Sequence, residues 1–126
     1  MRTTQPPLFS PETEWVMPDE LKDLTHCKEI AVDLETYDPN LTISGSGSVV
    51  GNGHIAGVAL AVEGWSGYCP IGHENGGNMD TTLVFSWLRD LFKDPNKTFI
   101  FHNAMYDVCW IRSMGIQING QIVDTM

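Results

Sequence analysis

The feature that most constrains this chain is the seven-residue segment IAVDLET, at residues 30–36. Apolar and acidic residues alternate in it, and a β-strand turns successive side chains to opposite faces. Asp33 and Glu35 would therefore project from one face, about 6.6 Å apart along the strand, with the apolar side chains on the other. Like charges at this spacing repel each other, and burial penalises both. A hard cation with oxygen ligands, Mg²⁺ or Mn²⁺, relieves both effects.

The same segment has a simpler interpretation. An amphipathic strand at the edge of a sheet would expose Asp33 and Glu35 to water and would need no metal. Seven residues do not separate the two interpretations, so the rest of the chain has to decide between them.

Length and composition favour one folded domain. The chain has 126 residues, of which 42% are hydrophobic and 18% charged, as in soluble globular proteins. No apolar run is long enough to span a membrane. The N-terminal sequence MRTTQPPLFSPETEW lacks the apolar core of a signal peptide, so we expect a cytoplasmic protein.

The net charge of −9 argues against a basic groove that grips nucleic acid through phosphate contacts alone. It does not exclude nucleic acid, because divalent ions would bring positive charge to a phosphate site, and a larger parent protein could supply a basic surface. Acidity can also serve solubility alone.

The cysteines are odd in number, widely spaced and without zinc-finger spacing to the histidines, which argues against disulfides and against a structural zinc site. We interpret them as buried free thiols. They are Cys27, Cys69 and Cys109.

Two stretches lack the periodicity of helices or strands. Residues 1–24 hold four of the seven prolines, which predicts an extended arm, docked by Phe9, Trp15 and Val16. Residues 38–53 are rich in Gly, Ser and Asn and lack the Lys-Ser/Thr ending of a phosphate-binding loop. This composition predicts a flexible loop.

Regular elements are predicted around these stretches from alternation, helical spacing and turn residues. Strands are expected at residues 28–35, 54–62, 65–70, 98–101 and around Ile122 and Val123, with a turn at Glu63-Gly64. Helices are expected at residues 81–92, capped by Asp80, and at 103–114, ended by Gly115. The apolar face of the first helix comprises Leu83, Val84, Trp87, Leu88, Leu91 and Phe92. This order predicts an α/β layer fold with a mixed sheet, in which residues 98–101 form a buried parallel strand.

A second chemical segment is FHNAMYDVCW, at residues 101–110. Asn103 and Asp107 are four apart and share a helix face. Asp107 is surrounded by apolar residues, and a buried carboxylate needs a partner. Two simpler readings compete: Asn103 as the helix N-cap, and Asp107 as a charge that complements the helix dipole. The presence of Asp33 and Glu35 in the same chain, in a βαβ-type order of elements, makes both of these simpler interpretations less convincing.

VDLET, HNAMYD and the later DTM together resemble the 3′–5′ exonuclease domain of family A DNA polymerases. These domains are DEDD (DnaQ-like) exonucleases with a ribonuclease H-like fold: an antiparallel three-strand meander, then parallel strands, with helices packed on the sheet. VDLET is similar to the first motif, D-x-E, and NAMYD to the second, N-x-x-x-[FY]-D. PIGHENGGN and GQIVDTM also resemble phage and bacterial proofreading domains.

The resemblance implies a role for each matched residue. Asp33, Glu35 and Asp107 would be catalytic metal ligands for two Mg²⁺ or Mn²⁺ ions, with Asp33 bridging them. The substrate residues would be Thr36 near the terminal 3′-hydroxyl, Leu41 (less well Tyr37) against the terminal base, and Asn103 and Tyr106 along the single-strand cleft. Asp124 matches a family Asp-Thr without a catalytic role.

The family's third motif, a Tyr or His followed by a last Asp, has no counterpart in this sequence. The resemblance therefore implies an arm at residues 1–27 and the front part of an exonuclease domain at 28–126, with a polymerase domain C-terminal to it. We expect such a fragment to be weakly active or inactive.

The implied reaction is hydrolysis of the last phosphodiester of a single-stranded DNA 3′ end, releasing a nucleoside monophosphate in a bacterial or phage-infected cell. Two metal ions roughly 4 Å apart can activate the attacking water and stabilise the leaving oxygen. Three alternatives stay open: an exoribonuclease of the same fold, a module that binds DNA ends without cutting, and a structural domain with solvated carboxylates.

Overall fold

The computed structural model describes residues 20–126. The predicted docking residues Phe9, Trp15 and Val16 lie outside this range. Within it, none of the helices is both long and apolar enough to cross a membrane.

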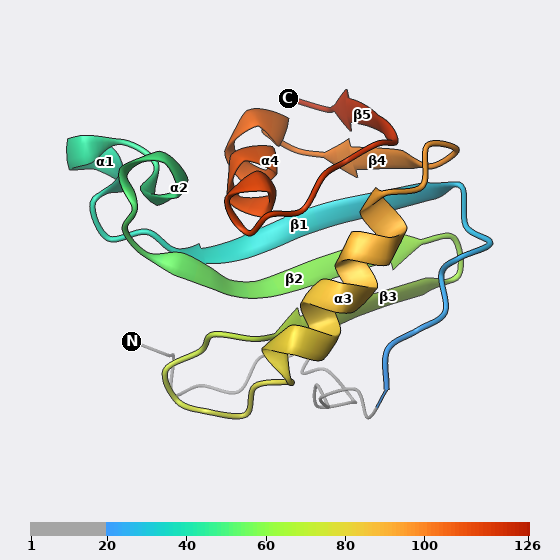
Figure 1. Cartoon of the computed structure of the whole chain (residues 1–126), viewed down its shortest axis with the longest axis horizontal. Helices are drawn as coiled ribbons and strands as arrows, with labels where there is room; N and C mark the ends of the chain where they lie inside the picture. Colours follow the sequence, from blue (N-terminus) through green and yellow to red (C-terminus); the bar gives the residue numbers. More distant parts are fainter. Residues whose placement is uncertain (1–19) are drawn as a thin grey trace, which may run out of the picture.

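Nine helices and strands follow one another within residues 20–126 (Figure 1). They are β1 (Glu29–Tyr37), α1 (Leu41–Ser44), α2 (Gly47–Val50), β2 (His54–Val62), β3 (Trp65–Pro70), α3 (Thr81–Phe92), β4 (Thr98–Phe101), α4 (Ala104–Ser113) and β5 (Gln121–Asp124). The strands form one sheet in the order β3-β2-β1-β4-β5. β1, β2 and β3 are an antiparallel meander, while β4 and β5 run parallel to β1. The predicted ribonuclease H-like mixed sheet is confirmed.

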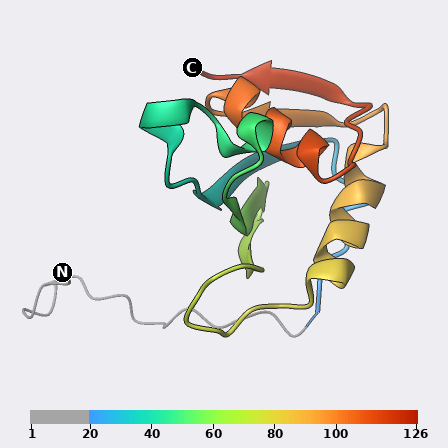
Figure 2. The ribbon, with the colours of Figure 1, turned by 60° about the vertical axis from the view of Figure 1, so that its left-hand side comes forward.

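Helices α3 and α4 lie on the same face of the sheet (Figures 1 and 2). Each is the crossover between parallel strands, and both crossovers step across the sheet in the same direction, which puts right-handed connections on one face. The core lies between this face and the helices. Ile30, Val32 and Leu34 of β1 are buried there, whereas Asp33 and Glu35, on the opposite face, are exposed.

Helix α3 begins as predicted, because the Asp80 carboxylate accepts hydrogen bonds from the amides of Thr82 and Leu83. Its buried stripe comprises Val84, Leu88, Leu91 and Phe92. The assignment of Leu83 to this stripe was wrong, since its side chain is 62% exposed. Leu83 lies about 100° round the helix from Val84, beyond the part of the helix surface that meets the sheet.

The prediction of a flexible loop at residues 38–53 was also wrong, because this segment contains α1 and α2. The Ser46 side chain accepts a hydrogen bond from the Ser48 amide at the start of α2. Gly51, with φ 80°, ends α2 in the left-handed conformation that glycine adopts most readily. The small residues here serve as caps for short helices.

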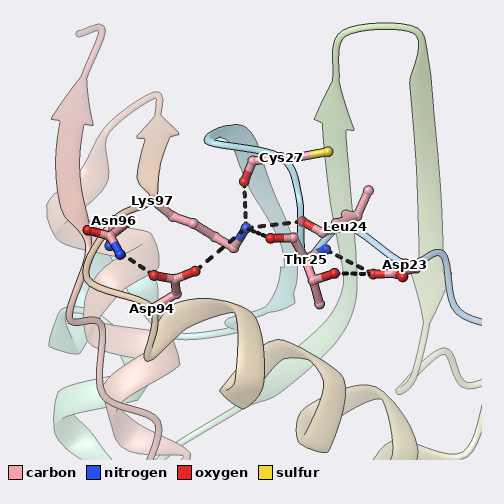
Figure 3. Close-up of polar contacts among 7 residues, drawn as sticks. All are labelled: Asp23, Leu24, Thr25, Cys27, Asp94, Asn96 and Lys97. Atoms are coloured by element: carbon pink, nitrogen blue, oxygen red, sulfur yellow. Dashed lines mark hydrogen bonds and ion pairs between the residues drawn. The ribbon is translucent and has the colours of Figure 1, made fainter.

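Lys97 ties the segment before β1 to the sheet (Figure 3). Its side chain is buried, and its ammonium group donates hydrogen bonds to the carbonyl oxygens of Leu24, Thr25 and Cys27. The Asp94 carboxylate lies 3.9 Å away. Leu24 is itself buried in the core, so the last residues of the predicted arm pack as part of this fold.

All three cysteines are free, as predicted. Cys69 is buried, and this burial raises the pKa of its thiol. Cys27 and Cys109 are only half-buried, so the expectation of buried thiols holds fully for Cys69 alone.

Candidate active site

The candidate site lies where β1 and β4 separate. The two strands pair only from Glu29 to Ala31 on the β1 side, so the later amides of β1 lack a partner strand on that edge. Asp107 of α4 occupies this gap, and its Oδ2 accepts a hydrogen bond from the Leu34 amide at 3.2 Å. Leu34 lies between Asp33 and Glu35, so this contact joins the two acidic segments of the sequence.

The Asp107 carboxylate is buried, at 4% exposure. Burial raises its pKa from 3.8 to about 6, and the negative charge of Asp33 adds to the rise, while the Leu34 hydrogen bond opposes it. A carboxylate held in this way has too little compensation for its charge. Asp107 is thus buried, as its apolar sequence context predicts, and the described residues offer it an amide and a like charge.

Asp33 and Glu35 act on different neighbouring groups. Asp33 acts electrostatically on Asp107, although α4 packs on the opposite face of the sheet, because the Asp107 carboxylate reaches the edge of β1. Glu35 acts instead on Tyr68, whose phenol pKa is raised by burial and further by this charge. Within residues 20–126 no group of three or more His, Cys, Asp or Glu side chains is assembled to hold a metal ion.

Thr36 and Tyr106, which adjoin Glu35 and Asp107 in the sequence, contact each other. Thr36 follows Leu34 on the helix side of β1, and its Oγ1 lies 2.8 Å from the Tyr106 hydroxyl. That hydroxyl donates a hydrogen bond of 2.7 Å to Oδ2 of Asp38. Burial raises the pKa of the Tyr106 phenol, and Asp38 adds to the rise, so the phenol keeps its proton. Asp38 belongs to neither motif, and no local sequence pattern predicts this contact.

Asn103 stands at the N-cap of α4, but its side chain makes no capping hydrogen bond. Its backbone is in the left-handed conformation, with φ 65°. Asp124 supplies the cap: its carboxylate accepts hydrogen bonds from the amides of Asn103 and Ala104, at 3.0 and 3.1 Å. The pairing of Phe101 with Asp124 brings this carboxylate to the start of α4. Hydrogen bonds from the amides of Met126, Ala104 and Asn103 lower the pKa of Asp124.

Leu41 and Tyr37, the predicted contacts of a terminal base, are both exposed apolar side chains near the end of β1. Leu41 belongs to α1 and is 42% exposed. The Tyr37 ring lies 5.5 Å, centre to centre, from the ring of His54. Both side chains are accessible to a ligand.

A hollow of about 1120 Å³ lies on the sheet face away from the helices, with Asp33 in its lining. Small residues form much of its floor, among them Ala31 and Ala59, and Tyr68 forms part of its wall. The Tyr68 hydroxyl lies 2.6 Å from Nε2 of His73. Asp33 is therefore open to a ligand on one face of the sheet while its charge reaches Asp107 at the strand edge.

No protein-family model matches the sequence. A DNA-directed DNA polymerase of Pseudomonas phage M6 is 37% identical to this chain over an alignment of 122 residues, and the match covers 93% of the chain. This chain is homologous to a phage DNA polymerase. It spans 18% of the length of that relative. The resemblance to a polymerase that the motifs suggested is thereby confirmed.

The fold is shared with solved structures of NrnC from Brucella melitensis. One has a TM-score of 0.54 and 21% sequence identity, and the match covers 82% of this chain and 43% of NrnC. A second, NrnC with bound Mg²⁺, has the same TM-score, identity and coverage of this chain, with 44% of NrnC matched. At this identity the likeness establishes the fold.

Proposed function

We propose that this chain is the front part of a metal-dependent 3′–5′ exonuclease domain that hydrolyses single-stranded DNA 3′ ends and proofreads for a DNA polymerase. The homology to a phage polymerase supports the choice of DNA and of a polymerase domain in the same protein. The motif resemblance supports the direction of digestion and the release of nucleoside monophosphates.

One observation carries the proposal: the buried Asp107 carboxylate hydrogen-bonds to the amide between Asp33 and Glu35 and feels the charge of Asp33. A structural domain gains nothing from this arrangement, because the charge of Asp107 is poorly compensated. A cation near Asp33 and Asp107 would neutralise both. Perturbed carboxylates of this kind are typical of catalytic sites.

The donor set fits Mg²⁺ or Mn²⁺, because the available groups are carboxylate oxygens. Asp33 and Asp107 would hold the first ion. Glu35, two residues after Asp33 on β1, would contribute a third carboxylate. A pair of ions would activate water and stabilise the leaving oxygen. NrnC with bound Mg²⁺ supports this choice of metal.

The predicted substrate residues would bind the single DNA strand. Thr36 would meet the terminal 3′-hydroxyl, Leu41 would pack against the terminal base, and Asn103 and Tyr106 would line the cleft. The side chain of Asn103 is available for this role, because Asp124 caps α4 in its place. We further propose that a longer protein supplies the fourth acid and the Tyr or His of the third motif.

The test is release of nucleoside monophosphate from a 3′-labelled single strand in Mg²⁺, by residues 1–126 and by a protein extended through the third motif. We expect robust release from the longer protein and very little from residues 1–126, because loss of one metal ligand removes several kcal/mol of transition-state stabilisation. Equal, robust rates would show that the catalytic set lies within these 126 residues.

Matched DNA and RNA strands of one sequence test the exoribonuclease alternative, which predicts faster digestion of the RNA. A strand-binding assay tests the DNA-end-binding alternative, and Mn²⁺ titration, read by electron paramagnetic resonance, tests the structural one. A DNA-end-binding module would retain the single strand without shortening it. A structural domain would bind Mn²⁺ equally before and after Asp107→Asn.

A further inference from the structure

Four residues form a continuous chain of hydrogen bonds beside the candidate site. Thr36 Oγ1 lies 2.8 Å from the Tyr106 hydroxyl, which lies 2.7 Å from Asp38 Oδ2. Both carboxylate oxygens of Asp38 accept from the Gly47 amide, at 3.0 and 3.1 Å. The chain thus runs from the proposed 3′-hydroxyl contact on β1 to the start of α2.

The direction of this chain follows from its protons. A carboxylate only accepts hydrogen bonds, so Tyr106 uses its single proton on Asp38. The Tyr106 oxygen must then accept at its contact with Thr36, which makes the Thr36 hydroxyl the donor. Because the Thr36 hydroxyl proton is already donated to Tyr106, Oγ1 can only accept a hydrogen bond from a ligand.

The shape of the backbone holds Asp38 in this role. Gly47 is buried, and a Cβ there would lie 1.8 Å from the carbonyl oxygen of Asn52 and 2.8 Å from Oδ1 of Asp38. Only glycine lets α2 bring its amide so close to the carboxylate. The segment that composition suggested to be a flexible loop therefore anchors the far end of the hydrogen-bond chain.

We propose that Asp38 sets the direction of this chain so that Thr36 acts as an acceptor, which selects strands ending in a 3′-hydroxyl, a donor, over strands ending in a 3′-phosphate. The inference rests on the proposed function, because it assumes that the strand terminus meets Thr36. Asp38 is a positioning residue, since it acts on the terminus only through Tyr106 and Thr36. A free hydroxyl in place of Thr36 would rotate to donate or accept and would not discriminate in this way.

The test uses the full-length protein and one 5′-labelled strand with three ends: 3′-hydroxyl, 3′-phosphate and 3′-deoxy. Loss of the terminal nucleotide gives kcat/KM for each. We expect wild type to prefer the hydroxyl end over the 3′-deoxy end by about three- to tenfold, the range that one hydrogen bond supports, and over the phosphate end by more. In Asp38→Asn, the new amide group can donate to Tyr106, and the preference for hydroxyl over phosphate should fall about tenfold.

Further variants separate an effect on the direction of these hydrogen bonds from a general effect on the fold. Thr36→Ser keeps the hydroxyl and should keep the preference, whereas Thr36→Val should lose it. Tyr106→Phe breaks the chain at its middle and decides the question if Asp38→Asn does not fold. Asp90→Asn, an exposed site on α3, should match wild type on every end. If Asp38 only supports the local structure, Asp38→Asn should lower the rates on all three ends by the same factor.

The outcomes distinguish the two proposals. A wild-type protein that shortens none of the three ends in Mg²⁺ or Mn²⁺ contradicts the proposed function and this inference together. An active wild type whose preference survives both Asp38→Asn and Tyr106→Phe contradicts the inference alone. An active wild type whose preference is lost in both variants supports it.

Discussion

The Asp107 carboxylate accepts a hydrogen bond from the main-chain amide of Leu34, which lies 73 positions earlier in the chain. The contact forms because β4 stops pairing with β1 at Ala31 and α4 enters the space that follows. It fixes the helix that carries the second acidic motif to the strand that carries the first. A local break in strand pairing therefore builds the candidate site.

The raised pKa of Asp107 predicts a pH-dependent effect of Asp107→Asn on folding. The group has a pKa of about 6 in the folded chain, against an ordinary value of 3.8, so the folded state binds the proton more tightly. The contribution of protonated Asp107 to the free energy of unfolding is therefore fully present below about pH 3.8, and it is lost as the pH rises through about 6. Asparagine keeps an acceptor for the Leu34 amide and carries no charge. In metal-free buffer it should stabilise the chain by about 3 kcal/mol at pH 7.5 and by less than about 1 kcal/mol at pH 4.

Urea unfolding at the two pH values measures this difference, with Asp90→Asn as the exposed control. A gain of equal size at both pH values would mean that ionisation of Asp107 is not its cause.

Lys97→Met should destabilise the chain by about 3 kcal/mol, because it leaves buried carbonyl oxygens without their donor. The methionine keeps most of the apolar stem, so the loss reports on the ammonium group. Lys93→Met is the matched control: Lys93 pairs with Asp90 at 3.3 Å on an exposed part of α3, and such pairs contribute less than about 1 kcal/mol. Equal midpoints of chemical denaturation for the two variants would refute the structural importance of Lys97.

Leu88→Ala should cost about 2–5 kcal/mol, since it opens a cavity between α3 and the sheet. Leu83→Ala, in the same helix, should cost less than about 0.5 kcal/mol because its side chain is mostly in water. Chemical denaturation of the two variants checks the pair, and similar losses would show that the stripe assigned here is wrong.

Elements governed by strong local periodicity were predicted to the residue. The alternation at His54–Val62 and the capped, apolar-striped helix at Thr81–Phe92 are examples. The apolar face of this helix was predicted too wide, because it included Leu83. Residue spacing alone does not show which part of the helix surface meets the sheet. Residues 38–53 were misread because glycine and serine are used both in loops and in the caps of short helices.

Geometric features of the candidate site were predicted where they lie within one element and missed where they depend on contacts between elements. The shared face of Asp33 and Glu35 and the burial of Asp107 follow from strand and helix periods. The roles of Asp38 and Asp124 depend on contacts with residues 68 and 20–21 positions away, which no local pattern reveals.

The central claim is that Asp33, Glu35 and Asp107 form the metal-binding core of an exonuclease. The most direct measurement is the Mg²⁺-dependent rate of nucleoside monophosphate release from a 3′-labelled single strand by the full-length protein and its Asp107→Asn variant. We expect Asp107→Asn to lose a factor of about a hundred or more in rate, equivalent to about 2.7 kcal/mol or more of transition-state stabilisation, and Asp90→Asn to keep the wild-type rate. An Asp107→Asn protein that digests the strand at the wild-type rate would contradict it.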